Sequence, residues 1–351
     1  MRLSRRRLNR TLLQRQHLLE RVDAAVVDEA RHLVGLQAQE NLPPYLSLAA
    51  RLSELDPADV TRGLEDRTLV RLLTMRGTIH LLAAEDALPL RAWTQPRMEQ
   101  ELRSSQNVRG AADVDRAAFA AALRAALADG PLAQKELAQR LAEAFPDRPA
   151  TALGQVARLA APLAQLPPRG CWKRSGGVVY QYADAWLGRD GWDAAPPDVP
   201  EVVRRYLRAF GPATAADVTA WSAVTRLGPV LAAMTDLVRH EDDAGRTLYD
   251  VPDGELADED VPAPVRLLGC YDNVWLSHAR RDRVTDPEKR NAWMGVNGGT
   301  ANALFVDGWL EGLWRVEDGR VHVLETLRPL TRSEQSGLAS ESARVERLLA
   351  R

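Results

Sequence analysis

Two glutamines separated by a single residue stand just before a pair of prolines. Gln37 and Gln39 flank Ala38, and Pro43 and Pro44, which follow closely, are predicted to stop a helix. In a continuous helix the two side chains would point to nearly opposite sides, whereas extended backbone directs residues i and i+2 to one face. We therefore expect a preceding helix to end near Gly35, so that both amides can meet one ligand. The alternative is that the two glutamines only cap backbone groups.

An amide is suited to some chemistry and unsuited to other chemistry. Its oxygen accepts hydrogen bonds and its nitrogen donates them, but it takes up no proton near neutral pH. Gln37 and Gln39 are therefore predicted to position a ligand and to interact with developing charge. The sequence identifies no general base.

Basic side chains recur at three further places. Two alternate along a predicted strand, two lie at a predicted hairpin, and four follow an aromatic-rich run that is predicted to be a strand. Such side chains suit phosphate contacts, although a solvated surface charge, a polar hairpin or a structural ion pair would explain each group equally well. We expect Asp272 to orient one of the last group, and Asn41 to support the glutamines. The candidate phosphate-binding residues are Arg76, His80, Lys173, Arg174, His278, Arg280, Arg281 and Arg283.

Several kinds of site are disfavoured by the sequence. It contains no GxGxxG, Walker A, HExxH or GxSxG motif and no Cys and His grouping at metal-ligand spacing, so we expect no cofactor and no metal. Cys171 and Cys270 are too few and too far apart for a disulfide framework, which favours a reducing compartment. The basic start lacks a following apolar run, and no stretch is long enough to span a bilayer. A cytoplasmic, nucleoid-associated location is the resulting expectation.

The charge distribution is more informative than its total. The net charge of −2 over 351 residues does not indicate a partner, but the 46 basic residues include only three lysines, so 43 are arginine, the side chain suited to bidentate phosphate contacts. Residues 1–21 hold seven arginines against one acid, and residues 241–261 are strongly acidic. One basic face on a nearly neutral protein is therefore a possibility to test.

The chain shows an internal repeat of about eighty residues. One copy has predicted helices at 114–128, 134–145 and about 150–165, then a hairpin around Ser175-Gly176-Gly177. The next has helices at 199–210, 215–222 and about 227–237, then a hairpin formed by 238–241 and 246–251. A looser first copy has helices at about 24–36 and 46–53 and a hairpin at 69–82. Three helices followed by a two-stranded wing are typical of a winged helix-turn-helix.

The last part of the chain changes character. Strand-forming runs at 265–268, 303–306, 308–316 and 320–326 precede a helix at 333–349, and Asp318-Gly319 is a strong hairpin signal. The predicted class is α+β, mostly α, with three tandem winged helices and a C-terminal β-rich subdomain. The predicted boundaries are 1–113 with the glutamine motif, 114–193, 194–258 and 259–351.

The sequence Leu36-Gln-Ala-Gln39, followed by Met75-Arg-Gly-Thr-Ile-His-Leu81, resembles the winged-helix (HTH-42) DNA glycosylase superfamily, over most of the chain. Its Gln-aliphatic-Gln motif is similar to the AlkZ-like type, associated with azinomycin self-resistance in streptomycetes, rather than to the type with Gln-aliphatic-Asp. The block Gly269 to Val284 is similar to a further block of that family. The resemblance implies a C-shaped arrangement of the winged helices around a DNA channel, with Gln37 and Gln39 as the catalytic pair.

This resemblance implies a reaction. Alkylation at N7 makes a purine a cationic leaving group, so cleavage of its glycosidic bond needs stabilisation of an oxocarbenium-like sugar and a placed water, which amides can help to supply. The implied partner is duplex DNA containing alkylated purines, including interstrand crosslinks, with no obligate protein partner. No lysine lies near the motif to form a Schiff base, so a monofunctional glycosylase is expected. A winged-helix transcription regulator and a non-catalytic protein that shields damaged DNA are the alternatives.

Overall fold

A computed structural model describes residues 1–189, 197–286 and 301–351. The N-terminal part contains the expected helices and hairpin, but its prolines act differently from the prediction. Pro43 and Pro44 begin a helix instead of ending one, because proline at the first helical positions loses no hydrogen bond. A 21-residue helix that the sequence did not predict follows the hairpin. The elements are β1 (Arg2–Leu3), α1 (Arg5–Arg15), α2 (Val26–His32), β2 (Leu36–Gln37), α3 (Pro43–Arg51), α4 (Pro57–Glu65), β3 (Leu69–Leu73), η1 (Met75–Gly77), β4 (Ile79–Ala83), α5 (Ala84–Ser104) and η2 (Gln106–Ala111).

The second part confirms three helices followed by paired strands, with two corrections. The third helix ends at Ala160, since Pro162 cannot continue it, and the first strand of the pair is Leu163–Gln165. The hairpin predicted around Ser175-Gly176-Gly177 is wrong in its first strand, because residues 170–174 belong to a long loop before the second strand. The elements are α6 (Arg116–Ala126), β5 (Leu132–Ala133), α7 (Gln134–Ala144), α8 (Ala150–Ala160), β6 (Leu163–Gln165), β7 (Val179–Tyr182) and α9 (Ala183–Leu187).

The remaining elements follow the predicted order, except at Asn273–Leu276, where the run predicted to be a strand is a short helix. The predicted boundary at 193/194 lies outside the described residues. The strong turn at Asp318-Gly319 has both residues at positive φ, 49° and 73°, as a two-residue hairpin turn requires. The elements are α10 (Val199–Phe210), α11 (Ala215–Ser222), α12 (Gly228–Ala233), β8 (Val238–Asp242), β9 (Thr247–Asp250), β10 (Arg266–Leu268), α13 (Asn273–Leu276), β11 (Asn302–Val306), β12 (Trp309–Glu317), β13 (Arg320–Thr326) and α15 (Arg332–Ala350).

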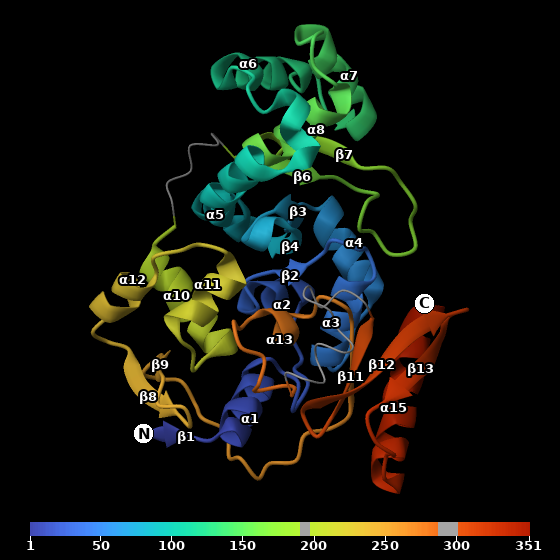
Figure 1. Cartoon of the computed structure of the whole chain (residues 1–351). Helices are drawn as coiled ribbons and strands as arrows, with labels where there is room; N and C mark the ends of the chain where they lie inside the picture. Colours follow the sequence, from blue (N-terminus) through green and yellow to red (C-terminus); the bar gives the residue numbers. More distant parts are fainter. Residues whose placement is uncertain (190–196, 287–300) are drawn as a thin grey trace.

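Three sheets organise these elements (Figure 1). A six-stranded sheet has the order β2-β4-β3-β6-β7-β5, so the first two predicted repeats share one sheet, joined where Arg71 of β3 pairs with Gln165 of β6. A three-stranded sheet, β1-β8-β9, brings the N-terminus beside the third hairpin. The C-terminal strands form a sheet of order β10-β11-β12-β13, against which α15 packs.

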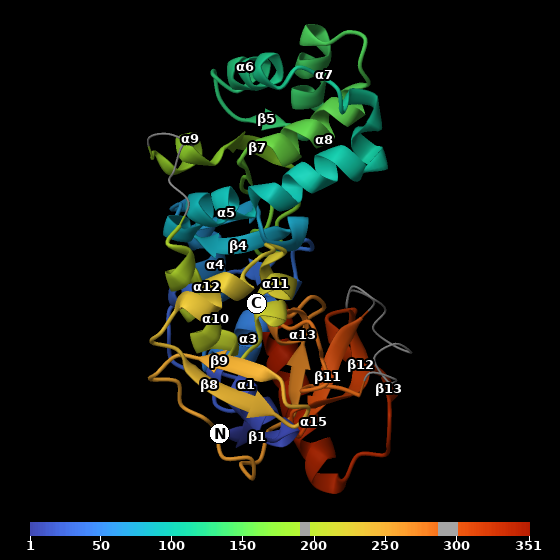
Figure 2. The ribbon, with the colours of Figure 1, turned by 60° about the vertical axis from the view of Figure 1, so that its left-hand side comes forward.

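The glutamine-bearing strand β2 lies at the edge of the six-stranded sheet, near the middle of the molecule. Figure 1 shows α6, α7 and α8 above it, α10–α12 to one side and the C-terminal sheet to the other; Figure 2 shows the same arrangement from a second direction. Most of the core falls into two large apolar clusters, one under the first two repeats and one reaching from α5 to α10–α13. The motif strand contributes Leu36 and Ala38 to the former.

The arginines near the N-terminus do not form a free basic face. Most of them pair with acids from distant parts of the chain, two of which lie in the acidic stretch at residues 241–261. The ion pairs are Arg2 with Asp243, Arg6 and Arg10 with Asp307, Arg15 with Asp250, and Arg21 with Glu341. Two of these five ion pairs, those to Asp243 and Asp250, join the basic start of the chain to the acidic stretch.

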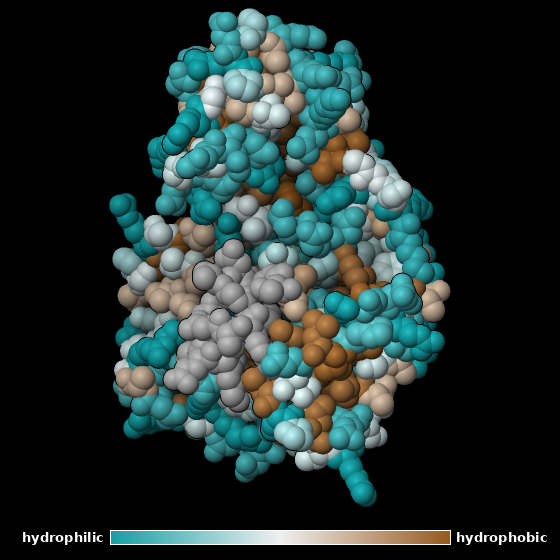
Figure 3. All heavy atoms as spheres, turned by 45° about the vertical axis from the view of Figure 1, so that its right-hand side comes forward, coloured by the Kyte–Doolittle hydropathy of each residue, from teal (hydrophilic) through white to brown (hydrophobic). Residues whose placement is uncertain are grey.

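The surface seen in Figure 3 is mostly hydrophilic, with apolar atoms gathered mainly in its lower half. Exposed large apolar side chains include Val323 and Leu324 of β13. No helix within the described residues has the length and apolar character needed to cross a bilayer.

Candidate active site

The helix that precedes the glutamine motif ends before Gln37, as expected from the sequence. Helix α2 ends at His32, and β2 pairs with β4 in antiparallel register, Gln37 opposite His80. The Ala38 N–H donates to the Ile79 carbonyl at 2.7 Å. The predicted extended backbone is present at Leu36–Gln37, and Gln39 follows the buried Ala38 in a bend.

Gly35 makes the change from helix to strand possible. Its φ is +98°, and a Cβ at this position would lie 2.5 Å from Cδ2 of Leu82. Its carbonyl accepts a hydrogen bond of 2.8 Å from the side-chain amide of Asn273, which fixes the strand from the far end of the chain. Sequence reasoning missed Asn273, although it stands inside the quoted block that begins at Gly269.

Gln37 is buried, with 6% of its surface exposed, and its amide orientation is determined. Nη2 of Arg76 donates to Gln37 Oε1 at 2.9 Å and to His80 Nε2 at 3.0 Å, and Nη1 donates to the Trp221 carbonyl at 2.5 Å. A guanidinium can only donate, so the atom facing it is the amide oxygen. The Gln37 amide nitrogen has no hydrogen-bond partner among the described residues.

Arg76 does not lie on a strand, which corrects one expectation. It occupies the tight turn η1 with a φ of 57°, and the turn, rather than strand alternation, brings its guanidinium to His80 on β4. Its three acceptors are all neutral, and no carboxylate of the described chain pairs with it. Burial, and secondarily the charge of Arg281, lower the pKa of Arg76 to about 10, which leaves it a cation at neutral pH.

His80 is neutral and both of its ring nitrogens are engaged. Nδ1 lies 3.0 Å from the Thr78 carbonyl, so Nδ1 carries the proton and Nε2 accepts from Arg76. Burial and then the Arg76 charge hold the pKa of His80 well below its ordinary value. His80 therefore orients Arg76 and has no free lone pair for proton transfer.

Gln39 is exposed, unlike Gln37. Its Oε1 accepts a long hydrogen bond, 3.3 Å, from the Ile79 N–H. A backbone N–H also can only donate, so this contact too is made by the amide oxygen. Both glutamines thus turn an oxygen toward the protein, and neither amide nitrogen is bonded to a described residue.

A buried arginine, Arg71, holds the backbone of the glutamine motif by a hydrogen bond. Nη2 of Arg71 donates to the Ala38 carbonyl at 2.8 Å, between the two glutamines. Its side chain passes over Gly170, whose φ is +88° and where a Cβ would lie 2.5 Å from Arg71 Cδ. The Tyr45 hydroxyl donates to the Gly170 carbonyl at 2.7 Å. The sequence signal for Arg71 was a charged residue within the apolar run of β3.

The two supporting residues named from the sequence differ in the structure. Asp272 is buried and forms a bidentate ion pair with Arg51, at 2.7 and 2.8 Å, instead of orienting an arginine of its own block. Although burial opposes it, the Arg51 charge keeps the pKa of Asp272 below its usual value. Asn41 lies beside the motif, and its Oδ1 is buried with no hydrogen-bond partner in the described structure.

The remaining candidate phosphate-binding residues are not brought together with the motif as one group. Arg174 pairs with Glu65 of α4, and Lys173 lies over the Trp172 ring, 5.8 Å from its centre. The backbone N–H of Trp172 donates to Thr61, so this loop is attached to α4. These exposed side chains remain open to solvent.

The block after Asp272 is partly internal. The aromatic-rich run predicted to be a strand is the short helix α13. His278 and Arg283 are buried and donate to the carbonyls of Phe210 and Pro212. A phosphate group could reach neither without rearrangement of the core, whereas Arg280 is exposed and Arg281 is half-buried.

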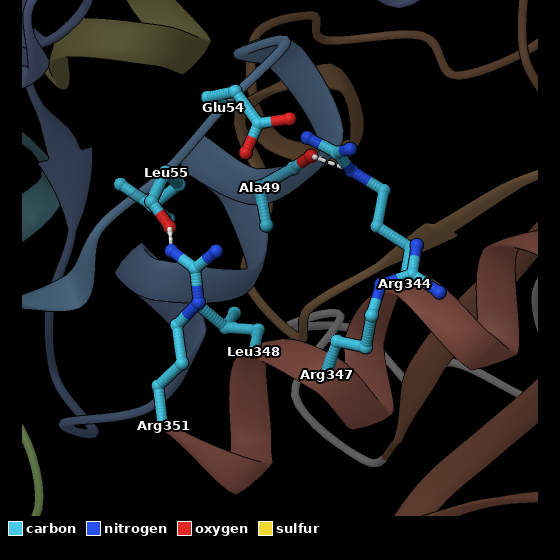
Figure 4. A pocket seen from close by; sticks show the side chains of 7 residues that line it. All are labelled: Ala49, Glu54, Leu55, Arg344, Arg347, Leu348 and Arg351. Carbon is cyan, nitrogen blue, oxygen red and sulfur yellow. Dashed lines mark hydrogen bonds between the residues drawn. The ribbon is translucent and has the colours of Figure 1, made fainter.

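Hollows also occur away from the glutamine motif. Figure 4 shows a cavity of about 70 Å³ between α3 and α15, in which Arg344 and Arg351 donate to the carbonyls of Ala49 and Leu55 and so attach α15. A hollow of about 580 Å³ lies between α10 and α12. No cluster of three or more His, Cys, Asp or Glu side chains suited to a metal occurs in residues 1–189, 197–286 and 301–351.

Comparison with known proteins defines first the fold and then the family. The chain superposes on the solved structure of the DNA glycosylase AlkZ of Streptomyces sahachiroi with a TM-score of 0.83 and 24% identity, covering 100% of this chain and 98% of the other. A relative from the same organism, described as an interstrand DNA cross-link repair glycosylase, is 26% identical over 95% of this chain and 94% of its own. The DNA glycosylase AlkZ-like family matches residues 30–348. The chain belongs to this family and is a DNA N-glycosylase.

Proposed function

We propose that this protein hydrolyses the N-glycosidic bond of N7-alkylated purines in duplex DNA, including purines tethered in interstrand crosslinks, and that Gln37 and Gln39 form its catalytic pair. The observation that carries the proposal is the clamp on Gln37: Arg76 holds its amide oxygen at 2.9 Å on an edge strand, with the exposed Gln39 two residues away. A fixed amide beside a cation is the preorganised polar group that charge separation at a glycosidic bond requires.

The charges at this site favour DNA. Arg76 is a desolvated cation with three neutral partners, and Arg281 is near enough to lower its pKa. A phosphate group beside the damaged nucleotide would supply the missing negative charge, and guanidinium binds phosphate strongly. We expect Lys173, Arg174, Arg280 and Arg281 to add contacts along the duplex.

The helix and strand order supports a finer description of the fold. Helices α6, α7 and α8 precede a strand pair, and α10, α11 and α12 precede the β8–β9 hairpin. We interpret these units, with a first one around β3 and β4, as three winged helices bordering a C-shaped DNA channel. In this proposal the protein acts in the cytoplasm on DNA, without a cofactor or an obligate protein partner.

The test is incubation with duplex DNA carrying N7-methylguanine, with detection of released base and heat-labile abasic sites. We expect Gln37→Ala and Gln39→Ala to lower single-turnover excision by 10²-fold or more, in the range found for loss of one preorganised donor. Gln335→Ala, an exposed glutamine on α15, is the matched control. Equal excision by all variants would contradict the assignment of the pair, and absence of excision by the unaltered protein would contradict the substrate class.

A further inference from the structure

The attacking water needs an acceptor for its proton, and the glutamine pair is a poor one. Each amide oxygen already accepts a hydrogen bond, from Arg76 in one case and from the Ile79 N–H in the other. An oxygen bonded to a guanidinium has less electron density to offer a second donor. The free sides of both amides are N–H groups, which hold a water by its oxygen and take no proton from it.

The other titratable groups that border the motif are also unsuited to accept a proton. His80 has both ring nitrogens engaged. Arg71 and Arg76 are cations at neutral pH. Burial raises the pKa of the Cys270 thiol to about 11, and burial also raises the pKa of the Tyr271 hydroxyl, so these two stay protonated.

A carboxylate is attached directly to the motif. Glu40 follows Gln39, it is exposed, and it forms no ion pair with any residue that the structure describes. The negative charge of Glu40 raises the pKa of Arg71, which donates a hydrogen bond to the motif, and the pKa values of Cys270 and Tyr271. The Glu40 carboxylate thus directly follows the glutamine pair, is exposed in the bend after β2, and has no ion pair within the described part of the chain.

We propose that Glu40 is the general base of the reaction. This inference rests on the proposed function. A water held by the amide N–H groups attacks C1′ of the deoxyribose as the C1′–N9 bond breaks. The bonding electron pair passes to the purine, which leaves neutral, and a proton of the water passes to the Glu40 carboxylate. The products are an abasic sugar, a neutral alkylated purine and a protonated Glu40, which loses its proton to solvent.

The experiment compares Glu40→Gln and Glu40→Ala with Glu143→Gln, which removes an equal charge from an exposed position on α7. Single-turnover excision of N7-methylguanine should fall by about 10²–10⁴-fold in both Glu40 variants and remain unchanged in the control. Affinity for the same duplex should be unchanged or higher in the Glu40 variants, because a negative charge beside the phosphates is removed. Formate, a small carboxylate, should restore part of the rate of Glu40→Ala.

The pH dependence separates a base from a structural residue. The rate of the unaltered enzyme, corrected for spontaneous base loss, should fall on the acid side, whereas Glu40→Gln should have a flat profile. Excision by Glu40→Gln within threefold of the unaltered enzyme would contradict the role of Glu40 and leave the proposed function intact. Loss of rate without rescue by formate and with lowered thermal stability would also contradict it. An inactive unaltered protein would contradict the proposed function itself.

Discussion

Replacement of Arg71 by methionine should slow excision by removing a hydrogen bond to the motif while it leaves the stability of the fold nearly unchanged. Arg71 is buried, with 2% of its surface exposed, and its bond to the Ala38 carbonyl is its shortest contact. Methionine has a similar length and fits the apolar path over Gly170, but it cannot hold that carbonyl. We expect excision to fall while the protein stays folded.

The magnitudes of two opposing effects lead to this expectation. Burial lowers the pKa of Arg71 to about 10, from 12.5. At about 1.4 kcal/mol per pKa unit, keeping the charge in the folded state costs on the order of 3 kcal/mol. This cost is present below pH 10 and is relieved as the pH rises through that value, because the folded state then releases the proton first. A bond from a charged donor returns about 1.5–3 kcal/mol, so the free energy of unfolding should change by less than about 2 kcal/mol.

The catalytic effect has a different origin. Ala38 lies between the two glutamines, and loss of its anchor lets the strand edge move. A displacement of about 1 Å at a reacting group costs on the order of 10²-fold in rate. The assay is single-turnover excision of N7-methylguanine by Arg71→Met, with urea unfolding of the same preparation to report the free energy of unfolding.

A matched variant makes the result interpretable. Arg91 is equally buried, burial lowers its pKa to about 9, and it also donates to a backbone carbonyl, that of Leu159, away from the motif. Arg91→Met should retain the excision rate. Unchanged excision by Arg71→Met would refute a positioning role, and equal losses in the two variants would show that the effect is a general one on the fold.

Three further predictions concern packing and pH. Gly170→Ala should destabilise the protein by about 1–3 kcal/mol and slow excision, because its φ of +88° and the approach of Arg71 both exclude a Cβ; unaltered unfolding curves would refute this. Asp272→Asn leaves Arg51 buried without its carboxylate partner, which should lower the free energy of unfolding by about 3–5 kcal/mol; a variant as stable as the parent in urea would contradict this. Because the pKa of Asp272 is lowered in the folded state, the stability of the unaltered protein should fall as the pH drops below about 4. Burial lowers the pKa of His278 to about 3, so the free energy of unfolding should also decline as the pH falls from about 6.5 toward 3. His278→Gln should make this decline shallower in unfolding measured against pH, and a profile identical to that of the unaltered protein would disprove the role of His278.

Much of the fold was predictable because its signals are local. Hydrophobic spacing located α6, α7, α10 and α11, and the turn residues located the hairpins β8–β9 and β12–β13. The errors have local causes too. Pro43 and Pro44 were interpreted as a helix stop although proline is equally suited to a helix start, and α5 contains Pro89 and Pro96, which disfavour a helix interior in isolation.

The site was predictable in its residues and not in its contacts. The i, i+2 spacing of Gln37 and Gln39 predicted extended backbone, and the structure has a strand at Leu36–Gln37 with Gln39 in the bend that follows. The partners of these residues come from far along the chain: Arg76 and Trp221 for the clamp, Arg71 for the support. No local pattern contains such distances, since they depend on how the sheet and helix α11 pack.

The sequence by itself determined which groups are present: two amides at i, i+2 spacing, a carboxylate directly after them, many arginines, and helices that alternate with hairpins. The reason is that residue type sets the chemistry and residue spacing sets the local backbone preference. Tertiary structure alone decided which arginines form ion pairs with acids, that Arg71 and Arg76 instead donate to neutral groups at the motif, and which side of each amide faces outward. The physical reason is that burial and pairing are properties of neighbours in space, and those neighbours lie tens to hundreds of residues apart in the chain.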